Sequence, residues 1–460
     1  MLRPVQLAES LVHRALEVLD SAADGEEGLI SVSVPAVGLS LRSLPPLEPP
    51  YLFWTHPDKD DLLIGVGIAF QINTEGPRRF ETLANEWRDL SWQNLDPDDT
   101  GCDPMAFLGC AFDPNEPMRG IWAGFPNAGV FVPTLTMRQN GGDALLTYTA
   151  RADQSRDVTA AEWARITHYL VDAIALAVAP AGSRTRLTRV AVAPEAGEWR
   201  QLVARAVEAI RAGRLTKVVP VRRLRVCAER HLAPARLALT LRHLYPSCTV
   251  FAAHLGGRCL IGATPERLVG IQGSRLTSEA IAGTERRAAN DRQDRELGEA
   301  LLASTKARHE HALVAEAVRE ALAPLCHRFT MQAIPELIKL RNLQHLRTPV
   351  SGDLRRGTTL LDVAKRLHPT PAVGGVPQAD ALCWLARHNP TQRGWYTGTV
   401  GWITPGGGGK LAVTLRCALL EDECADLFAG AGIVADSDPQ AELEETELKF
   451  TAILEALENA

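Results

Sequence analysis

The sequence predicts an α+β protein with large, antiparallel-rich sheets flanked by helices. Strand-like runs follow one another across tight turns, while helical segments come in blocks instead of alternating regularly with single strands. The chain has 460 residues, of which 46% are hydrophobic and 23% charged, and its formal net charge is −6. This composition supports at least one substantial core and excludes a disordered, collagen-like or coiled-coil chain.

Residues 1–190 are predicted to form a strand-rich N-terminal part. An amphipathic helix opens it, because apolar side chains recur near helical spacing at Leu7, Leu11, Leu16 and Leu19. Strands follow at 29–37 and 62–72, and a hairpin pairs 130–136 with 144–149 across the turn Asn140-Gly141-Gly142. A helix carrying Trp163 and Leu170 then ends at Pro180. We expect connecting chain at 180–183 and 194–197, which places a boundary near residue 190.

Residues 191–460 are predicted to form the second part. A helix with Trp199 and Ile210 on its apolar face is closed by Gly213. A long helix is expected at 299–322, and a last helix after the capping sequence Asp438-Pro439. The strands are expected at 217–226, 248–254, 258–262, 275–280, 396–403, 411–419 and 425–428.

Composition also limits the location and partners of the chain. No apolar run approaches the roughly 18–20 residues that span a bilayer, and no signal peptide is recognisable at the start. The mildly acidic balance argues against a broad nucleic-acid surface. Nine cysteines without a CxxC pair form no legible disulfide framework, which indicates a reducing compartment. We therefore expect a cytoplasmic protein that binds neither nucleic acid nor membrane.

Carboxylates on two predicted helices are candidate metal ligands. Glu310 shares a helix face with Val314 and Ala317, where a carboxylate is costly to bury without a positive partner. On the last helix, Glu442 and Glu445 project from one face at i, i+3. Oxygen ligands of this kind suit Mg²⁺, which takes one or two carboxylates, several waters and an anionic substrate group. From the helix of Glu310 alone, a rim glutamate paired with arginine is the simpler interpretation.

Two other motifs fail on their context. The segment 430–435 matches the dinucleotide fingerprint G-x-G-x-x-G/A, but no second strand with an acidic residue follows it, which argues against a Rossmann site. Contact of its backbone amides with some other anion stays open. The sequence His309-Glu310-His311 is not a zinc HExxH motif, because Leu313 stands where its second histidine would be.

Several stretches together resemble the chorismate-utilising enzyme family, which includes isochorismate, salicylate, anthranilate and aminodeoxychorismate synthases. They span about residues 197–455 in the order of the family; before residue 190 the resemblance is limited to overall architecture. The stretches are KVVPVR at 217–222, IGATPERL at 261–268, EAIAGT at 279–284, RHEH at 308–311, LQHL at 343–346, HPTPAVGG at 368–375, GWYTG at 394–398, LR at 415–416, GAGI at 430–433, and DPQAELEET at 438–446 with Lys449. The usual tryptophan of the last motif is Leu443 here, which leaves the packing of that helix open.

Position 217 separates the chemistries within this family. Members that deliver ammonia have glutamine there, whereas those that add water at ring carbon 2 have lysine, and this chain has Lys217. Aminodeoxychorismate synthases carry a nucleophilic lysine where this chain has Ala282, and the stretch around Ala372 is more like that of isochorismate synthases. The resemblance thus implies an isochorismate synthase, an isomerase with the α/β sandwich fold of anthranilate synthase component I. In that fold the N-terminal part, residues 1–190, would interlock with the chorismate-binding catalytic part, residues 191–460.

The resemblance also implies the residues of the site. Lys217 would take a proton from water, and Glu266 would protonate the departing carbon-4 hydroxyl, for which burial must lower the pKa of the lysine and raise that of the glutamate. Mg²⁺ would be held by Glu310, Glu442 and Glu445, directly or through water. The substrate chorismate would be bound by Ala282, Gly283, Thr284, His345, Tyr396, Arg416, Gly432 and Lys449. His368 is expected to be a structural histidine at least as readily as a site residue.

Alternatives remain open at this point. A salicylate synthase would further expel pyruvate, an anthranilate-type subunit would use ammonia with an amidotransferase partner, and a non-catalytic relative would only bind. Lys217 argues against the amidotransferase partner, and we expect a monomer or weak homodimer. The product would enter menaquinone or siderophore synthesis, and the long N-terminal part favours the quinone branch.

Overall fold

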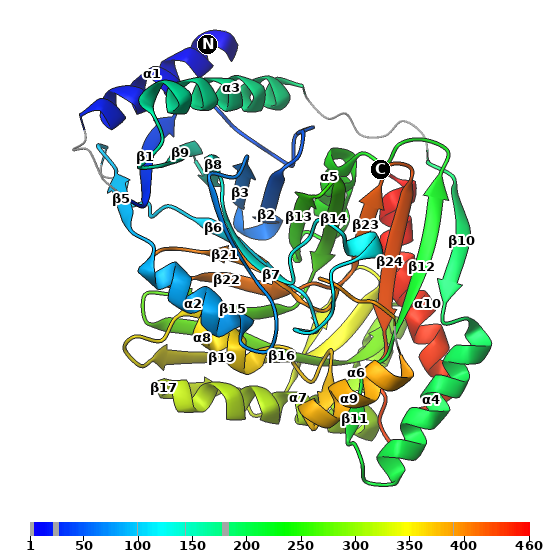
Figure 1. The fold of residues 1–460 in the computed structure, drawn as a ribbon. Helices are drawn as coiled ribbons and strands as arrows, with labels where there is room; N and C mark the ends of the chain where they lie inside the picture. Colours follow the sequence, from blue (N-terminus) through cyan, green and yellow to red (C-terminus); the bar gives the residue numbers. More distant parts are fainter. Residues whose placement is uncertain (1–3, 22–26, 99, 143, 177–183, 390) are drawn as a thin grey trace.

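The computed structural model consists of two large sheets packed face to face, with helices on both outer sides (Figure 1). It describes residues 4–21, 27–98, 100–142, 144–176, 184–389 and 391–460. The connecting chain expected at 180–183 lies outside the described residues. Within them, no helix is long and apolar enough to cross a membrane.

The first sheet has twelve strands, all antiparallel to their neighbours except for the parallel pair β1 and β5. Its order is β10-β12-β24-β23-β14-β13-β2-β3-β8-β9-β1-β5. The strands are β1 (Leu29–Ala36), β2 (Tyr51–His56), β3 (Asp61–Val66), β5 (Trp92–Leu95), β8 (Leu135–Asn140), β9 (Ala144–Arg151), β10 (Leu187–Ala193), β12 (Val221–Ala228), β13 (Thr249–Leu255), β14 (Arg258–Thr264), β23 (Cys417–Glu421) and β24 (Cys424–Gly430).

The second sheet is fully antiparallel and has the order β17-β19-β16-β15-β22-β21-β6-β7-β4, with β18 pairing β19. Its strands are β4 (Phe70–Thr74), β6 (Ala106–Cys110), β7 (Ala128–Val132), β15 (Arg267–Gln272), β16 (Arg275–Arg286), β17 (Cys326–Met331), β18 (Glu336–Lys339), β19 (Leu343–Leu354), β21 (Thr399–Ile403) and β22 (Gly409–Val413). A separate short pair joins β11 (Lys217–Val218) to β20 (Gly375–Val376).

The helices cover the outer faces of this sandwich. On the twelve-stranded sheet lie α1 (Pro4–Asp20) packed on α3 (Arg156–Ala175), then α5 (Pro234–Leu244) and α10 (Pro439–Glu458), which packs on α4 (Ala196–Arg211). On the ten-stranded sheet lie α2 (Arg79–Asp89), α6 (Asp291–Ala303), α7 (Thr305–Leu322) and α8 (Leu360–Leu367), while α9 (Gln378–His388) packs against β11 and β20. The sequence analysis did not predict α2, α5, α8 and α9.

Alternation along the strands divides the interior into layers. On β2, Tyr51 and Phe53 join the core beneath the helices, whereas Leu52 and Trp54 point into the core between the two sheets. Such alternation is what a strand buried on both faces requires. The core between the sheets is aromatic and includes Trp122 and Trp395, both almost fully buried.

Several predicted elements are wrong in their extent because the chain changes sheets inside them. Residues 62–72 form β3 and β4, and residues 130–136 form β7 and β8, in each case one strand in each sheet. Residues 217–226 form β11 and β12, and residues 411–419 form β22 and β23. The helix expected at 299–322 is two helices, because Ser304 caps α7 by accepting a hydrogen bond from the Ala307 amide.

One pair of cysteines is joined, although the sequence showed no legible disulfide framework. Cys227 and Cys424 form a disulfide between β12 and β24. Their pairing follows from the strand register, which sets the two residues directly opposite each other, with Cα atoms 4.1 Å apart. Because 197 residues separate them in sequence, no local spacing could reveal the pair. The remaining seven cysteines are free.

Candidate active site

A cavity of about 800 Å³, counting its open mouth, lies where both sheets and the helices α7 and α10 meet. Every predicted site residue except Glu442 lines it. Its wall also includes positions that the sequence analysis did not assign a role, among them Val219, Ile281, Val373, Thr397 and Phe428. A pocket of this size suits a small organic molecule.

Two crossings between the sheets build one side of the cavity. The chain leaves β14 for β15 at Pro265 and Glu266, and it leaves β22 for β23 at Leu415 and Arg416. Arg416 has a left-handed backbone with φ of 47°. A Cβ added at Gly262 would lie 2.7 Å from the carbonyl oxygen of Arg416. The close approach of the two crossings thus requires glycine at 262 and brings Glu266 and Arg416 into one wall.

Lys217, on the short strand β11, lines the same cavity and is fully buried. Its Nζ is 2.9 Å from Glu310 Oε1 of α7. A Cβ at Gly432 would lie 2.3 Å from that same carboxylate oxygen and 3.0 Å from Lys217 Cε. Glycine at 432 therefore makes room for the ion pair. This packing accounts for one glycine of the segment 430–435 with no need for a bound nucleotide.

Burial acts differently on the two carboxyl groups. Burial, followed by the negative charge of Glu279, raises the pKa of Glu266 to about 8, so that this side chain is protonated at neutral pH. Burial would also raise the pKa of Glu310, but the ammonium of Lys217 opposes it and the net result is a lowered pKa. Of these two groups, Glu266 is thus a neutral carboxylic acid and Glu310 a carboxylate.

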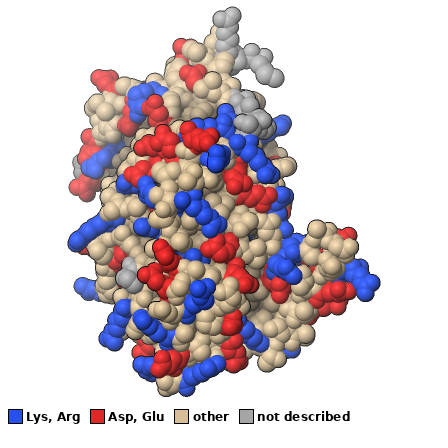
Figure 2. All heavy atoms as spheres, turned by 90° about the vertical axis from the view of Figure 1, so that its right-hand side faces the viewer, with Lys and Arg blue, Asp and Glu red and all other residues tan. Residues whose placement is uncertain are grey.

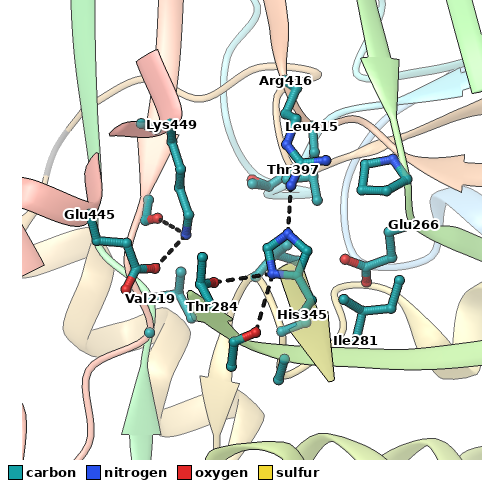
Figure 3. A pocket seen from close by; sticks show the side chains of 18 of the residues that line it. Val219, Glu266, Ile281, Thr284, His345, Thr397, Leu415, Arg416, Glu445 and Lys449 are labelled. Carbon is teal, nitrogen blue, oxygen red and sulfur yellow. Dashed lines mark hydrogen bonds and ion pairs between the residues drawn. The ribbon is translucent and has the colours of Figure 1, made fainter. Parts of the chain in front are cut away.

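His345 stands at the centre of a hydrogen-bond chain (Figure 3). Its Nε2 lies 2.6 Å from Arg416 Nη2, and its Nδ1 lies 3.2 Å from both the Gly283 carbonyl and Thr284 Oγ1. Burial and then the charge of Arg416 hold the pKa of His345 well below its usual value. The ring is therefore neutral, with its proton on Nδ1 for the carbonyl and its Nε2 accepting from the guanidinium.

The cavity offers further polar groups to an anionic ligand. Arg416 Nη1 is buried and makes no hydrogen bond within the described residues. Lys449 donates to the Gly430 carbonyl at 2.7 Å and pairs with Glu445 at 2.7 Å (Figure 3). Tyr396 stacks on Phe428, with ring centroids 5.1 Å apart, and burial raises its pKa. Because Lys449 is balanced by Glu445 and His345 is neutral, the net positive charge in this part of the wall is that of Arg416.

Glu442 lies beside the cavity, and its side chain is 2% exposed. Its Oε1 accepts a hydrogen bond from Lys306 Nζ at 2.8 Å. Burial and then the charge of Glu445 raise its pKa. No group of three or more His, Cys, Asp or Glu side chains is arranged to hold a metal ion among the residues that the structure describes. The three predicted carboxylates are near one another but each is paired with a lysine.

Some sequence expectations at this site find a simple structural outcome. His368 lies outside the cavity wall, buried between Arg79 and the Thr397 carbonyl, and burial lowers its pKa to about 3. Leu443 lies on α10, where the family motif has tryptophan, and its side chain is buried in the hydrophobic core. Lys306 was missed, although its position one helical turn before Glu310 is a signal that could have found it.

The surface beside α4, α10 and β12 carries both signs of charge. In Figure 2, lysine and arginine side chains are interspersed with aspartate and glutamate side chains over this face. No patch of a single sign dominates this face.

Comparison with known proteins supplies an independent view of the chain. The profile of the family described as chorismate binding enzyme matches residues 20–458. The salicylate biosynthesis isochorismate synthase of Pseudomonas aeruginosa is 34% identical over 413 residues, which are 89% of this chain and 85% of that protein. Isochorismate synthase MenF of Bacillus subtilis is 30% identical over 415 residues, covering 88% and 87%. The solved structure of MenF, the menaquinone-specific isochorismate synthase of Escherichia coli, matches with a TM-score of 0.80 at 26% identity, covering 98% of this chain and 100% of that one.

Proposed function

Because the chain belongs to the family of chorismate-binding enzymes, we propose that it is an isochorismate synthase, an isomerase that moves the hydroxyl of chorismate from ring carbon 4 to carbon 2. The single observation that carries this proposal is a buried lysine, Lys217, in one cavity with a glutamic acid, Glu266, that burial keeps protonated. The names of the similar proteins support the same reaction.

The two residues supply the proton transfers that the reaction needs. To act as the base, Lys217 must give up the ion pair with Glu310 and its proton; as a neutral amine it would then accept a proton from a water molecule while the water oxygen bonds to carbon 2. The ring double bonds shift, the bond from carbon 4 to oxygen breaks, and Glu266 donates its proton to the departing hydroxyl. One water enters and one leaves, so the product has the composition of the substrate. A glutamic acid with a pKa of about 8 is in the required protonated form at neutral pH.

Chorismate carries two carboxylates, and the overall charge of −6 would repel it. The cationic side chains in the wall offset that repulsion locally. Arg416, whose Nη1 has no hydrogen-bond partner among the described residues, would bind carboxylate oxygens together with Lys449 and Tyr396, which line the same cavity. The backbone around Gly283, Thr284 and Gly432 borders the same space.

The chemistry of the donors suits a divalent cation, although in this structure each carboxylate is paired with a lysine and the three are not gathered around one point. Glu310, Glu442 and Glu445 are oxygen donors from two helices. Burial and then the charge of Glu445 raise the pKa of Glu442, and a hard cation would relieve that repulsion. We assign these three residues to Mg²⁺, directly or through water. When bound there, Mg²⁺ would neutralise a substrate carboxylate and withdraw electron density from the ring.

Product analysis tests the proposal. The purified chain is incubated with chorismate and MgCl₂, and the products are separated and identified by mass and fluorescence. An isochorismate synthase gives a product of unchanged mass and no pyruvate. Fluorescent salicylate with pyruvate would instead identify a salicylate synthase, and a product that requires ammonia would identify an anthranilate-type subunit. If chorismate is not consumed at saturating Mg²⁺, the proposed activity is wrong.

A further inference from the structure

Each of the three carboxylates assigned to the divalent cation is bound to a lysine. The pairs are Lys217 with Glu310 at 2.9 Å, Lys306 with Glu442 at 2.8 Å, and Lys449 with Glu445 at 2.7 Å. One positive charge therefore stands against each negative charge, and the site is electrically balanced by the side chains of the protein itself.

Lys306 differs from the other two lysines in its surroundings. Lys217 and Lys449 line the cavity, whereas Lys306 lies in the first turn of α7 outside the cavity wall. Its side chain is 39% exposed, while that of its partner Glu442 is 2% exposed. Lys306 can therefore turn into solvent with its charge hydrated, whereas Glu442 stays buried and needs a positive partner.

We propose that Lys306 is a tethered counter-ion that competes with the divalent cation for Glu442 and thereby sets the affinity of the site for that cation. The inference rests on the proposed function, since it takes from it the assignment of Glu310, Glu442 and Glu445 to Mg²⁺. Lys306 itself touches neither the cavity nor the proposed reaction.

The competition follows from charge and from shared lone pairs. The ammonium of Lys306 occupies Glu442 Oε1, an oxygen that a metal ion or its water would use. Lys306 also lies within electrostatic range of Glu310 and Glu445, so it would repel a divalent cation placed among the three carboxylates. Binding of the cation thus releases Lys306 to solvent, and the return of Lys306 favours loss of the cation.

The experiment measures Mg²⁺ binding by the full chain without substrate. Lys306→Met removes the charge and keeps the apolar stem. Melting temperatures are recorded over a series of MgCl₂ concentrations at constant ionic strength, with calorimetric titration as a second measurement. We expect the Kd for Mg²⁺ to fall on the order of 10-fold, within the usual span of coupling between sites. We also expect a lower melting temperature without Mg²⁺, because Glu442 is then left unpaired.

Two control variants separate the role of Lys306 from a general effect of charge. Lys365→Met removes a lysine from the surface pair with Glu81, which measures 3.1 Å, with side chains 51% and 50% exposed. It should leave the Kd for Mg²⁺ unchanged. Lys306→Arg keeps the positive charge and should bind Mg²⁺ as the wild type does. In the Glu442→Gln background, Lys306→Met should lose most of its effect.

An unchanged Kd in Lys306→Met, or equal tightening in Lys365→Met, overturns the inference while the isomerase proposal stands. If Mg²⁺ neither binds to nor stabilises the wild type, the metal assignment and this inference fall together, and product analysis still tests the isomerase separately. Should Lys306→Met fold poorly, Lys306→Gln carries the same expectation, because it also removes the charge.

Discussion

Glu266 and His345 are both neutral near pH 7, although one is an acid and the other a base. Burial disfavours the charged form of each, so that it raises the pKa of Glu266 and lowers that of His345. Sequence motifs predicted that these residues share a site, and every predicted residue except Glu442 lines the cavity. The motifs could not predict the contacts within the site, such as the hydrogen bond between His345 and Arg416, because these contacts depend on distances between strands far apart in sequence.

The first prediction concerns the two proton-transfer residues. Glu266→Gln and Lys217→Ala should each lower kcat on the order of 10²–10⁴-fold, with chorismate binding largely retained, because each removes one proton transfer. In the wild type, kcat should fall as the pH rises through about 8, where Glu266 loses its proton. Steady-state kinetics over a pH series measure this. Near-normal turnover in either variant would contradict the assigned roles.

The second prediction concerns stability and Glu266. Its pKa is about 8 in the folded protein and 4.5 as an ordinary glutamate, so the folded state binds more protons between these values. Stability should therefore fall as the pH rises through that window, by up to ~1.4 kcal/mol per pH unit from this residue. Denaturant unfolding of wild type and Glu266→Gln at several pH values isolates the contribution. Equal slopes in the two proteins would show that Glu266 is not buried as an acid.

The third prediction tests His345 as a residue that positions Arg416. His345→Met offers the guanidinium only a weakly accepting thioether, so we expect KM for chorismate to rise on the order of 10-fold with a smaller change in kcat. His345→Gln offers an amide oxygen and should recover part of the loss. A fall in kcat alone, equal in both variants, would point to a direct part in the chemistry.

At the scale of elements, hydrophobic pattern located most strands but not the sheet to which each belongs. Residues 411–419 read as one strand because both halves are apolar and buried. The break at Arg416 rests on a left-handed backbone and on the approach of Gly262, neither of which a local pattern records. The same crossings carry site residues, which is why the site and the errors in strand extent coincide at Lys217 and Arg416.

The connection from β24 to α10 gives the fourth prediction. A Cβ at Gly432 would lie 2.3 Å from Glu310 Oε1, so Gly432→Ala should displace Glu310 and disturb its pair with Lys217. We expect kcat/KM to fall on the order of 10–100-fold with a folded protein. Gly406→Ala is the matched control, because its Cβ would meet no other atom than Thr404 Oγ1, at 4.0 Å. Equal activity of both variants would contradict the crowding at 432.

At the scale of the molecule, both parts of the chain contribute to both sheets. In the first sheet the N-terminal strand β2 pairs with β13 of the C-terminal part, and in the second sheet the N-terminal strand β6 pairs with β21. The family resemblance implied that the two parts interlock. Local periodicity could not have predicted it, because strand pairing between distant segments leaves no periodic signal. The core between the sheets likewise mixes residues from the two parts, such as Phe131 and Trp395.

This continuity predicts that residues 191–460 do not fold alone. Without the N-terminal part, β13 and β21 become long unpaired edges, which favour aggregation. Trp395 and its neighbours between the sheets would also lose Leu52, Trp54, Phe107, Trp122, Phe125 and Phe131. We expect the isolated piece to be insoluble or to lack a cooperative melting transition, and to turn over no chorismate, with the full chain as the reference. A soluble piece that melts cooperatively would contradict this prediction. It would show that residues 191–460 fold as a domain of their own without the pairing of β13 with β2 and of β21 with β6.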